Sequence, residues 1–432
     1  MKVLQNERKV LVSALLKAEK SGYSNIVLNS VLGETDLDSV KKGFVTTAFY
    51  GVLERKLFLD FVLNKFLKKP IEKSPPVTAS VLRAGAYQIL FMDKVPSSAA
   101  VNESVKLIRK SKESGKSGLV NAVLRKVSSE NLDSLLNEAS ENVRFSVSKW
   151  IYDKLILYYG KEQTHSFLEN SLLPPPLFVK ANTIKTTPNA LEEKLTLKNI
   201  TLAKTDLEGL FKAESVKNIE KSEEYLSGEF FVQDFSSSVA AAAVMAKPGM
   251  KVLDACAAPG GKTFSIAAMM ENRGEITALD LHEHRVKLIE NGAIRLGADI
   301  VRAKTCDAAS ASFSGEYFDR VLCDVPCSGI GVIRRKPEIK YKDENECSDL
   351  PQIQLEILEN SAKYLKKGGR LIYSTCTLLK NENEEVVNRF LERNKDFAPA
   401  KIGVLGIEDT NVTFIPPNFL GDGFFVAAFE RK

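Results

Sequence analysis

From residue 236 to residue 432 the sequence alternates short apolar runs with longer segments of helical periodicity. Strands are expected at 252–256, which is apolar, and at 275–280, 303–307, 319–324 and 366–374. Strands that alternate with helices predict a parallel sheet whose strands are joined by crossover helices. In open sheets of this kind, ligands bind beyond the carboxyl ends of the strands. We therefore expect an α/β domain with a ligand site at that edge.

The length of the chain indicates more than one domain. A chain of 432 residues is too long for one typical hydrophobic core. Residues 1–145 carry helical periodicity and almost no strand signal, so an all-α domain is expected there. Residues 146–235 mix helix and strand signals around a break at Pro174, Pro175 and Pro176, which predicts a small α+β subdomain with a strand at 177–182. The predicted domains are thus 1–145, 146–235 and 236–432.

The clearest helical signal of the first domain lies at residues 77–90. Leu82, Ala86, Ile89 and Leu90 recur there at helical spacing and predict a helix with one buried stripe. The same periodicity returns at residues 98–108 and 119–127. The first domain is therefore expected to be a compact helical fold.

Charge is distributed unevenly along the chain. The whole sequence has 60 Lys and Arg against 55 Asp and Glu, whereas residues 1–145 have 23 basic residues against 15 acidic ones. The basic excess thus belongs to the N-terminal part. Such an asymmetry indicates a polyanionic partner, although a solvated lysine-rich surface explains it equally well.

Composition and cysteine usage exclude several classes of protein. A content of 44% hydrophobic and 27% charged residues is typical of a globular protein, and no apolar run is long enough to span a bilayer. The N-terminus turns polar too early for a signal peptide. The six cysteines, all beyond residue 250, form no paired C-x-x-C and histidine pattern, so no metal site is expected. We expect a monomer in the cytoplasm, where thiols stay reduced.

The turn after the strand at 252–256 predicts a nucleoside site. Residues 257–263 are mostly small and lead into a helix, so backbone N–H groups can approach a ligand closely. The next strand ends on Asp280, 19 residues after Gly261, and a carboxylate there can accept both ribose hydroxyls. The turn matches neither a Walker loop nor a G-x-G-x-x-G loop. Adenosine without a pyrophosphate fits it best.

Four more chemically active residues follow later strand ends. Asp307 ends the strand at 303–307, beside the expected adenine, and Asp324 ends the strand at 319–324. Cys327 and Cys376 lie in turns just beyond two apolar strands. Because the carboxyl ends of parallel strands share one edge, these carboxylates and thiols are expected to gather there.

Together these strings resemble the RNA 5-methylcytosine methyltransferases that use S-adenosylmethionine. The similarity covers residues 254–263, 280, 307, 324–329, 333–340, 373–377 and 422–427. Residues 82–96, 99–103 and 120–126 resemble the NusB-type RNA-binding domain, and the combination is similar to the bacterial RsmB (Sun/Fmu) family that modifies 16S ribosomal RNA. One departure is the string 144–149, which replaces the usual Ser-His-Pro before Trp150.

The resemblance implies a Rossmann-like class I methyltransferase domain and a set of site residues. Cys376 would be the nucleophile that adds to carbon 6 of a cytidine in 16S ribosomal RNA, Asp324 would assist at ring nitrogen 3, and Cys327 would help to release the product. The implied S-adenosylmethionine site comprises Cys256, Ala257, Ala258, Pro259, Gly260, Gly261, Lys262, Asp280, Asp307 and Asp324.

Two other functions remain open from the sequence. A DNA cytosine methyltransferase would use Cys327 as its nucleophile and would not need Cys376. A NusB-like RNA-binding scaffold with a degenerate catalytic domain would need neither thiol, but the intact pair of thiols and the acids at successive strand ends disfavour it.

Overall fold

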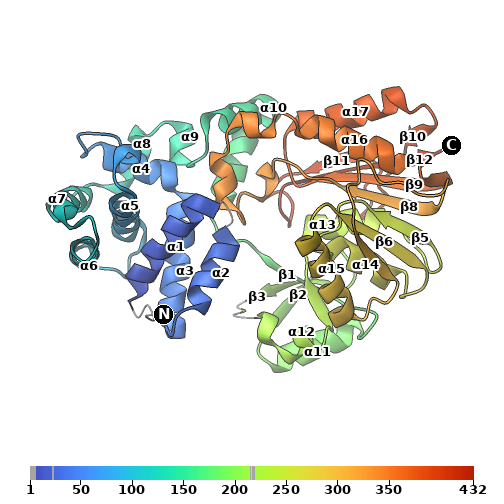
Figure 1. The fold of residues 1–432 in the computed structure, drawn as a ribbon, viewed down its shortest axis with the longest axis horizontal. Coiled ribbons are helices and arrows are strands. Elements are labelled where there is room, and N and C mark those ends of the chain that lie inside the picture. Colours follow the sequence, from blue (N-terminus) through green and yellow to red (C-terminus); the bar gives the residue numbers. More distant parts are fainter. Residues whose placement is uncertain (1–5, 22–23, 215, 217–218) are drawn as a thin grey trace. The chain divides into compact units, whose positions relative to one another are not determined.

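The computed structural model describes residues 6–21, 24–214, 216 and 219–432 (Figure 1). The chain forms two compact units. The first comprises Met1–Leu172 with Ile333–Glu344, and the second comprises Leu173–Val332 with Asn345–Lys432.

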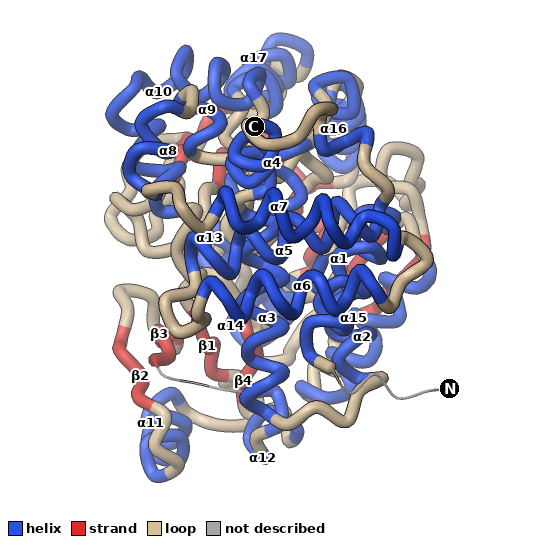
Figure 2. Tube along the Cα trace, turned by 90° about the vertical axis from the view of Figure 1, so that its left-hand side faces the viewer, coloured by secondary structure: helices blue, strands red, loops and turns tan. Residues whose placement is uncertain are grey.

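Helices build the first unit, and α5 lies at its centre. Helix α5 contacts α1, α3, α4, α6 and α7, and Figure 2 shows α6 and α7 side by side next to it. The predicted helix at 77–90 is confirmed, but the single buried stripe is wrong, because neighbouring helices bury every residue from Thr78 to Gln88. The helices are α1 (Glu7–Ser21), α2 (Ser24–Gly33), α3 (Ser39–Glu54), α4 (Lys56–Asn64), α5 (Pro76–Phe91), α6 (Ser97–Arg109), α7 (Ser117–Val127), α8 (Leu132–Glu138), α9 (Glu141–Arg144) and α10 (Lys149–Asn170).

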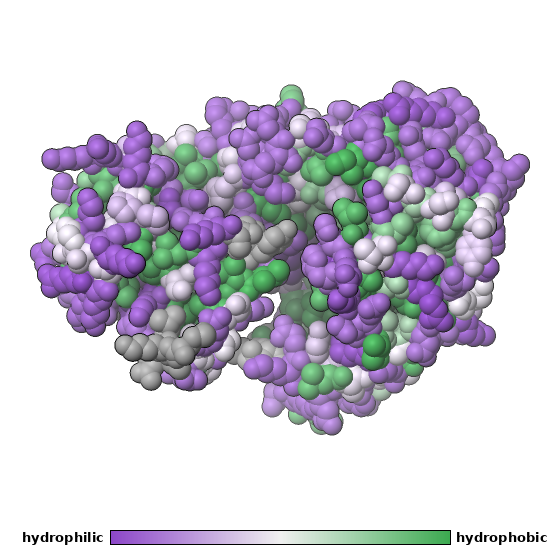
Figure 3. Space-filling view, viewed as in Figure 1, coloured by the Kyte–Doolittle hydropathy of each residue, from purple (hydrophilic) through white to green (hydrophobic). Residues whose placement is uncertain are grey.

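A segment from late in the sequence completes the first unit. Residues 333–344 include a short 3-10 helix, η5 (Pro337–Tyr341), that packs among the helices. Ser24 Oγ donates to Glu338 at 2.7 Å, and the Trp150 indole N–H donates to the Lys342 carbonyl at 2.7 Å. Lys340 is fully buried there. Figure 3 shows that the outer surface of this unit on the viewed face is mainly hydrophilic.

The second unit begins with a small antiparallel sheet of order β2-β3-β1-β4. Its elements are β1 (Leu177–Ala181), α11 (Pro188–Leu197), β2 (Thr201–Lys204), β3 (Leu210–Glu214), α12 (Glu223–Leu226) and β4 (Phe230–Val232). The predicted strand at 177–182 is confirmed as β1. Helix α10 belongs to the first unit and this sheet to the second, so the units divide the chain differently from the expected boundaries at 145 and 235. A separate domain at 146–235 stays a prediction.

The main sheet has the order β10-β12-β9-β8-β5-β6-β7, with β11 paired to β12. Its strands are β5 (Lys251–Asp254), β6 (Glu275–Asp280), β7 (Val301–Thr305), β8 (Phe318–Asp324), β9 (Leu365–Thr375), β10 (Phe397–Pro399), β11 (Asn411–Phe414) and β12 (Phe424–Arg431). The strands β5 to β9 are parallel, as expected. The sheet as a whole is mixed, because β10, β11 and β12 pair antiparallel.

Helices cover both faces of the main sheet (Figure 1). Neighbouring strand residues point to opposite faces, so Val252 packs into one apolar cluster and Leu253 into another. The first cluster includes α13 (Phe235–Ala243), α14 (Gly261–Met269) and α15 (Glu283–Leu296). The second includes α16 (Leu350–Ala362) and α17 (Glu384–Arg393). Strand order reverses at β5, where β6 lies on one side and β8 on the other, and ligands of such sheets bind at this reversal.

Candidate active site

The turn that follows β5 brings its backbone close to the neighbouring strand. The Ala257 N–H donates to the Leu279 carbonyl at 2.7 Å, and α14 begins at Gly261. Gly260 has a φ of +106°, and a Cβ there would lie 2.4 Å from the Phe264 ring. Only glycine fits this position without strain, so the turn can present main-chain N–H groups beyond the strand ends.

Asp254, the last residue of β5, is buried under this turn. Thr263 Oγ1 donates to Asp254 Oδ2 at 2.7 Å, while Asp254 Oδ1 is buried without a hydrogen-bond partner in the described part of the chain. Burial raises the pKa of Asp254 to about 7, against the opposing effect of the Thr263 hydrogen bond.

Asp280 and Asp307 follow the next two strands. Asp280 is only 3% exposed and accepts from the His282 N–H at 3.2 Å. Its Oδ2 lies 3.3 Å from Arg285 Nη1. Each carboxylate oxygen has two lone pairs, so both can still accept hydroxyl groups. Asp307 lies two residues beyond β7, is exposed, and caps a turn by accepting from the Ala309 N–H at 3.0 Å.

Asp324, the last residue of β8, connects that strand to helix α14 and to strand β9. The Lys262 ammonium donates to Asp324 Oδ2 at 2.7 Å, and Ser374 Oγ in β9 donates to Oδ1 at 2.8 Å. Burial lowers the pKa of Lys262, but the charge and hydrogen bond of Asp324 outweigh it and raise that pKa. Lys262 is therefore a firmly charged cation, and a Cys376 thiolate would also act on it electrostatically.

The two thiols of interest lie next to each other. Cys327 Sγ and Cys376 Sγ are 3.1 Å apart. Their hydrogen bond is the largest cause that raises the pKa of Cys327 well above its usual value, followed by burial. A Cys327 thiol that keeps its proton can donate a hydrogen bond to Cys376 Sγ.

Two neighbouring residues that the sequence analysis did not single out, Glu382 and Asn383, hold the loops of both thiols. Glu382 accepts from the Ser328 N–H at 2.9 Å, and Asn383 accepts from Thr375 Oγ1 at 2.6 Å. Both side chains are fully buried. In the sequence, Glu382 and Asn383 are only two adjacent polar residues that belong to no motif. Their burial could not have been predicted from that pattern.

The structure brings some of the expected site residues into direct contact and leaves others apart. Asp324 bonds Lys262, and Cys327 contacts Cys376, whereas no side-chain contact links Asp307 to them among the described residues. Burial raises the pKa of Cys256 well above its usual value, which disfavours a nucleophilic thiolate there. No group of three or more His, Cys, Asp or Glu in the described part of the chain could hold a metal. Among those same residues, no helix is both long and apolar enough to cross a membrane.

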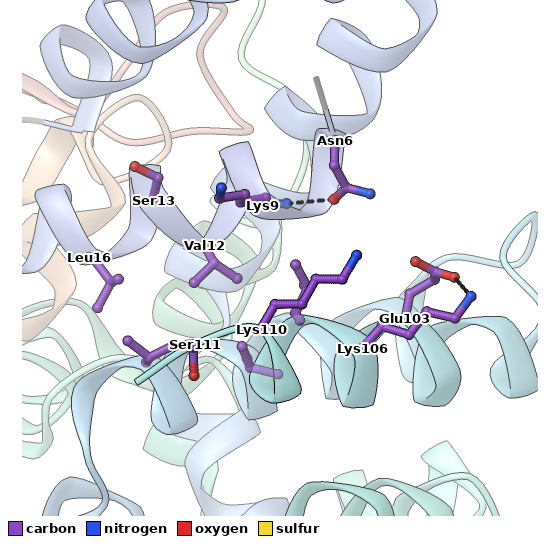
Figure 4. A pocket seen from close by; sticks show the side chains of 12 residues that line it. Asn6, Lys9, Val12, Ser13, Leu16, Glu103, Lys106, Lys110 and Ser111 are labelled. Atoms are coloured by element: carbon purple, nitrogen blue, oxygen red, sulfur yellow. Dashed lines mark hydrogen bonds and ion pairs between the residues drawn. The ribbon is translucent and has the colours of Figure 1, made fainter. Parts of the chain in front are cut away.

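The helical unit carries a groove of its own between α1 and α6 (Figure 4). It has a volume of about 450 Å³, with aliphatic side chains in its wall. Three lysines, Lys9, Lys106 and Lys110, line it, and Lys106 is paired with Glu103 at 2.7 Å. The groove therefore combines apolar contact with a net positive charge.

Known protein families match both parts of the chain. Residues 241–430 match the family described as 16S rRNA methyltransferase RsmB/F, and residues 5–129 match the NusB family. The fold is also that of the crystal structure of PH0851, with a TM-score of 0.86, 24% identity and full coverage of both chains. The structure of NSun6 from Pyrococcus horikoshii with SFG has a TM-score of 0.61 and 22% identity. The alignment covers 66% of this chain and 98% of the NSun6 chain.

Full-length relatives agree with these matches. The chain is 37% identical to "Probable ribosomal RNA small subunit methyltransferase B" of Bacillus subtilis (strain 168), over 98% of each chain. It is 30% identical to ribosomal RNA small subunit methyltransferase B of Salmonella heidelberg (strain SL476), over the full length of both. As a methyltransferase, the chain uses S-adenosylmethionine as methyl donor. The expected resemblance is confirmed, and the chain belongs to the RsmB family of ribosomal RNA small subunit methyltransferases, with a NusB-family domain at its N-terminal end.

Proposed function

We propose that the chain methylates carbon 5 of a cytidine in 16S ribosomal RNA through a covalent adduct with Cys376. One observation carries this proposal: the thiols of Cys327 and Cys376 are 3.1 Å apart, close enough for one to hydrogen-bond the other. Two thiols in contact match a reaction in which one attacks and the other assists.

The turn at 256–262 and Asp280 would hold S-adenosylmethionine. Gly260 lets the backbone approach the ligand, and Asp280 would accept the ribose hydroxyls. Asp307 would lie beside the adenine edge. When bound, the cofactor supplies an electrophilic methyl group on a sulfonium.

The first chemical step belongs to Cys376. Carbon 5 of cytosine is a poor nucleophile, but it becomes enamine-like once a thiolate has added to carbon 6. A Cys376 thiolate would be stabilised by the Lys262 ammonium, whose charge interacts with it. Lys262 is thus the group that would lower the pKa of the Cys376 thiol.

Asp324 would act at ring nitrogen 3. As the thiolate adds, the electron pair of the ring double bond moves toward that nitrogen. Lys262 Nζ donates to Asp324 Oδ2 at 2.7 Å, so a proton passed from Lys262 through the carboxylate can reach the nitrogen as its charge develops. Ser374 keeps the Asp324 carboxylate in orientation from the other side.

Cys327 would assist product release. After methyl transfer, carbon 5 loses its proton to a base in the solvent, the carbon 5–carbon 6 double bond returns, and the carbon 6–sulfur bond breaks. The electron pair of that bond goes to Cys376 Sγ. The Cys327 thiol, 3.1 Å away, stabilises this sulfur by its hydrogen bond.

The NusB-family domain would bind the RNA. The basic excess of residues 1–145 and the lysines of the groove between α1 and α6 support contact with phosphates. The DNA-type alternative needs Cys327 as the attacking thiolate, and the raised pKa of Cys327 argues against it.

Bisulfite mapping of 16S ribosomal RNA tests the function. A strain that lacks this gene is expected to lose one protected cytidine, and a plasmid with the wild-type gene should restore it. A plasmid carrying Cys376→Ala should not. Identical protection patterns with and without the gene would contradict the proposal.

A further inference from the structure

Adjacent residues just beyond the Cys376 turn make contact with the loops of both thiols. Glu382 closes the 3-10 helix η7 (Lys380–Glu382), and Asn383 follows it. Both side chains are fully buried. Buried polar side chains are costly unless their hydrogen bonds are satisfied, so such a pair marks a network that is specified by the fold.

Glu382 fixes the loop of Cys327 from both sides. Its carboxylate accepts from the N–H of Ser328, the residue after Cys327, at 2.9 Å. The same oxygen accepts from Gln354 Nε2 at 2.8 Å, and that amide also donates to the carbonyl of Pro326, the residue before Cys327, at 3.0 Å. The backbone on each side of Cys327 is thus held by one buried carboxylate and its amide partner.

Asn383 contacts the residues on each side of Cys376 in the chain. Its Oδ1 accepts from Thr375 Oγ1 at 2.6 Å, and its Nδ2 donates to the Thr377 carbonyl at 3.1 Å. These two threonines flank Cys376. A further hydrogen bond of 2.6 Å between the Ser328 and Thr377 hydroxyls links the two loops directly.

We propose that Glu382 and Asn383 are positioning residues that serve different steps, Glu382 placing Cys327 for release and Asn383 placing Cys376 for attack. This inference rests on the proposed function of the two thiols. The charge of Glu382 also contributes to the raised pKa of Cys327, after the larger effects of the Cys376 hydrogen bond and burial. Glu382 therefore helps to keep the proton on the assisting thiol.

The test follows the covalent adduct over time with full-length protein, 16S ribosomal RNA and S-adenosylmethionine. Glu382→Ala should form adduct at the wild-type rate and release it about tenfold to 100-fold more slowly, because small displacements of reacting groups have effects of that size. Asn383→Ala should form adduct more slowly by a similar factor and accumulate none. Glu382→Gln keeps an oxygen acceptor and should restore release. The pH profile of the release rate should shift to lower pH, because the charge that raises the pKa of Cys327 is lost.

Controls separate positioning from folding and from the proposed function. Glu385 is exposed in the same segment, and Glu385→Ala should behave as wild type. Cofactor binding by calorimetry shows whether a variant is folded, and Gln354→Met, which removes the contact with Pro326, is the second variant should Glu382→Ala not fold. If Cys327→Ala accumulates adduct but folded Glu382→Ala and Gln354→Met release product normally, the positioning role is wrong. If Cys327→Ala accumulates none, the proposed release role itself fails.

Discussion

Cys327 Sγ lies 3.1 Å from Cys376 Sγ, at the ends of two neighbouring parallel strands. The pairing of Asp324 with Ser374 in β8 and β9 sets the register from which both turns leave the sheet. The two turns therefore meet at the edge where the cofactor turn of β5 also lies. Cys327 and Asp324 from the end of β8 and Cys376 from the end of β9, the groups for which we propose catalytic roles, thus come from two adjacent strands.

The contact between the thiols predicts sensitivity to oxidation. Oxidised glutathione should convert the two thiols to a disulfide, with two electrons and two protons passing to the reagent, because a shift of about 1 Å brings the sulfurs to the bonded distance of about 2.05 Å. Methyl transfer should stop and return with dithiothreitol. Peptide mass spectrometry should find the Cys327–Cys376 link, and Cys306→Ala should leave it unchanged. Loss of activity without that link would contradict the prediction.

Asp280→Ala is expected to weaken cofactor binding. A hydrogen bond to a charged group is worth about 1.5–3 kcal/mol, so losing the ribose contacts should raise the dissociation constant at least about tenfold. Calorimetry with S-adenosylmethionine measures it. Glu283→Ala, at an exposed acid three residues further on, is the matched control. Equal affinities for wild type and Asp280→Ala would show that the ribose does not bind at the end of β6.

Several site residues at the carboxyl ends of the parallel strands could be predicted from local sequence patterns. The strand ends at Asp280 and Asp324 could be predicted because an apolar run that stops at an acid is visible in a few residues. Their convergence could be predicted because parallel strands share one edge. The 2.7 Å pair of Lys262 with Asp324 could not, since the two residues are 62 positions apart and no spacing rule joins them.

Other features have no local signature at all. Residues 333–344 join the helical unit although they follow the Cys327 turn directly, and burial of Lys340 is the opposite of what a lysine-rich string predicts. Glu382 and Asn383 likewise look like exposed polar residues in the sequence. Glu382 contacts a backbone group of the distant Cys327 loop, which only the folded chain brings to it, and Asn383 contacts the threonines on each side of Cys376.

Buried Lys340 predicts a pH dependence of stability. Burial lowers its pKa to about 7 from 10.5, although Glu54 opposes the shift. The unfolded chain then binds more protons between these values, so unfolding free energy should rise with pH from about 7 upward, by at most about 1.4 kcal/mol per pH unit.

Urea denaturation followed by the fluorescence of Trp150, the only tryptophan, measures this effect in the helical unit. Lys340→Met should flatten the rise between pH 7 and 9, because the titrating group is gone. Lys336→Met, at an exposed position of the same segment, should keep it. A slope that survives in Lys340→Met would assign it to another group.

The groove between α1 and α6 predicts where part of the RNA affinity arises. Replacing both Lys9 and Lys110 by alanine should weaken RNA binding and reduce the dependence of log affinity on log salt by about 1.5, because two phosphate contacts are lost. Fluorescence anisotropy at several salt concentrations measures both quantities. Lys247→Ala, at an exposed lysine of the second unit, is the control. An unchanged slope in the double variant would place the RNA elsewhere.

The claim that Cys376 attacks and Cys327 assists release is tested most directly by a denaturing gel. Single variants are incubated with 16S ribosomal RNA and S-adenosylmethionine before the gel is run. Cys327→Ala should attack, transfer the methyl group and remain attached to its product as a slowly migrating band. Cys376→Ala should give no band and no methylation, and the double variant should give none. Adduct that accumulates in Cys376→Ala and is missing in Cys327→Ala would contradict the account and make Cys327 the nucleophile.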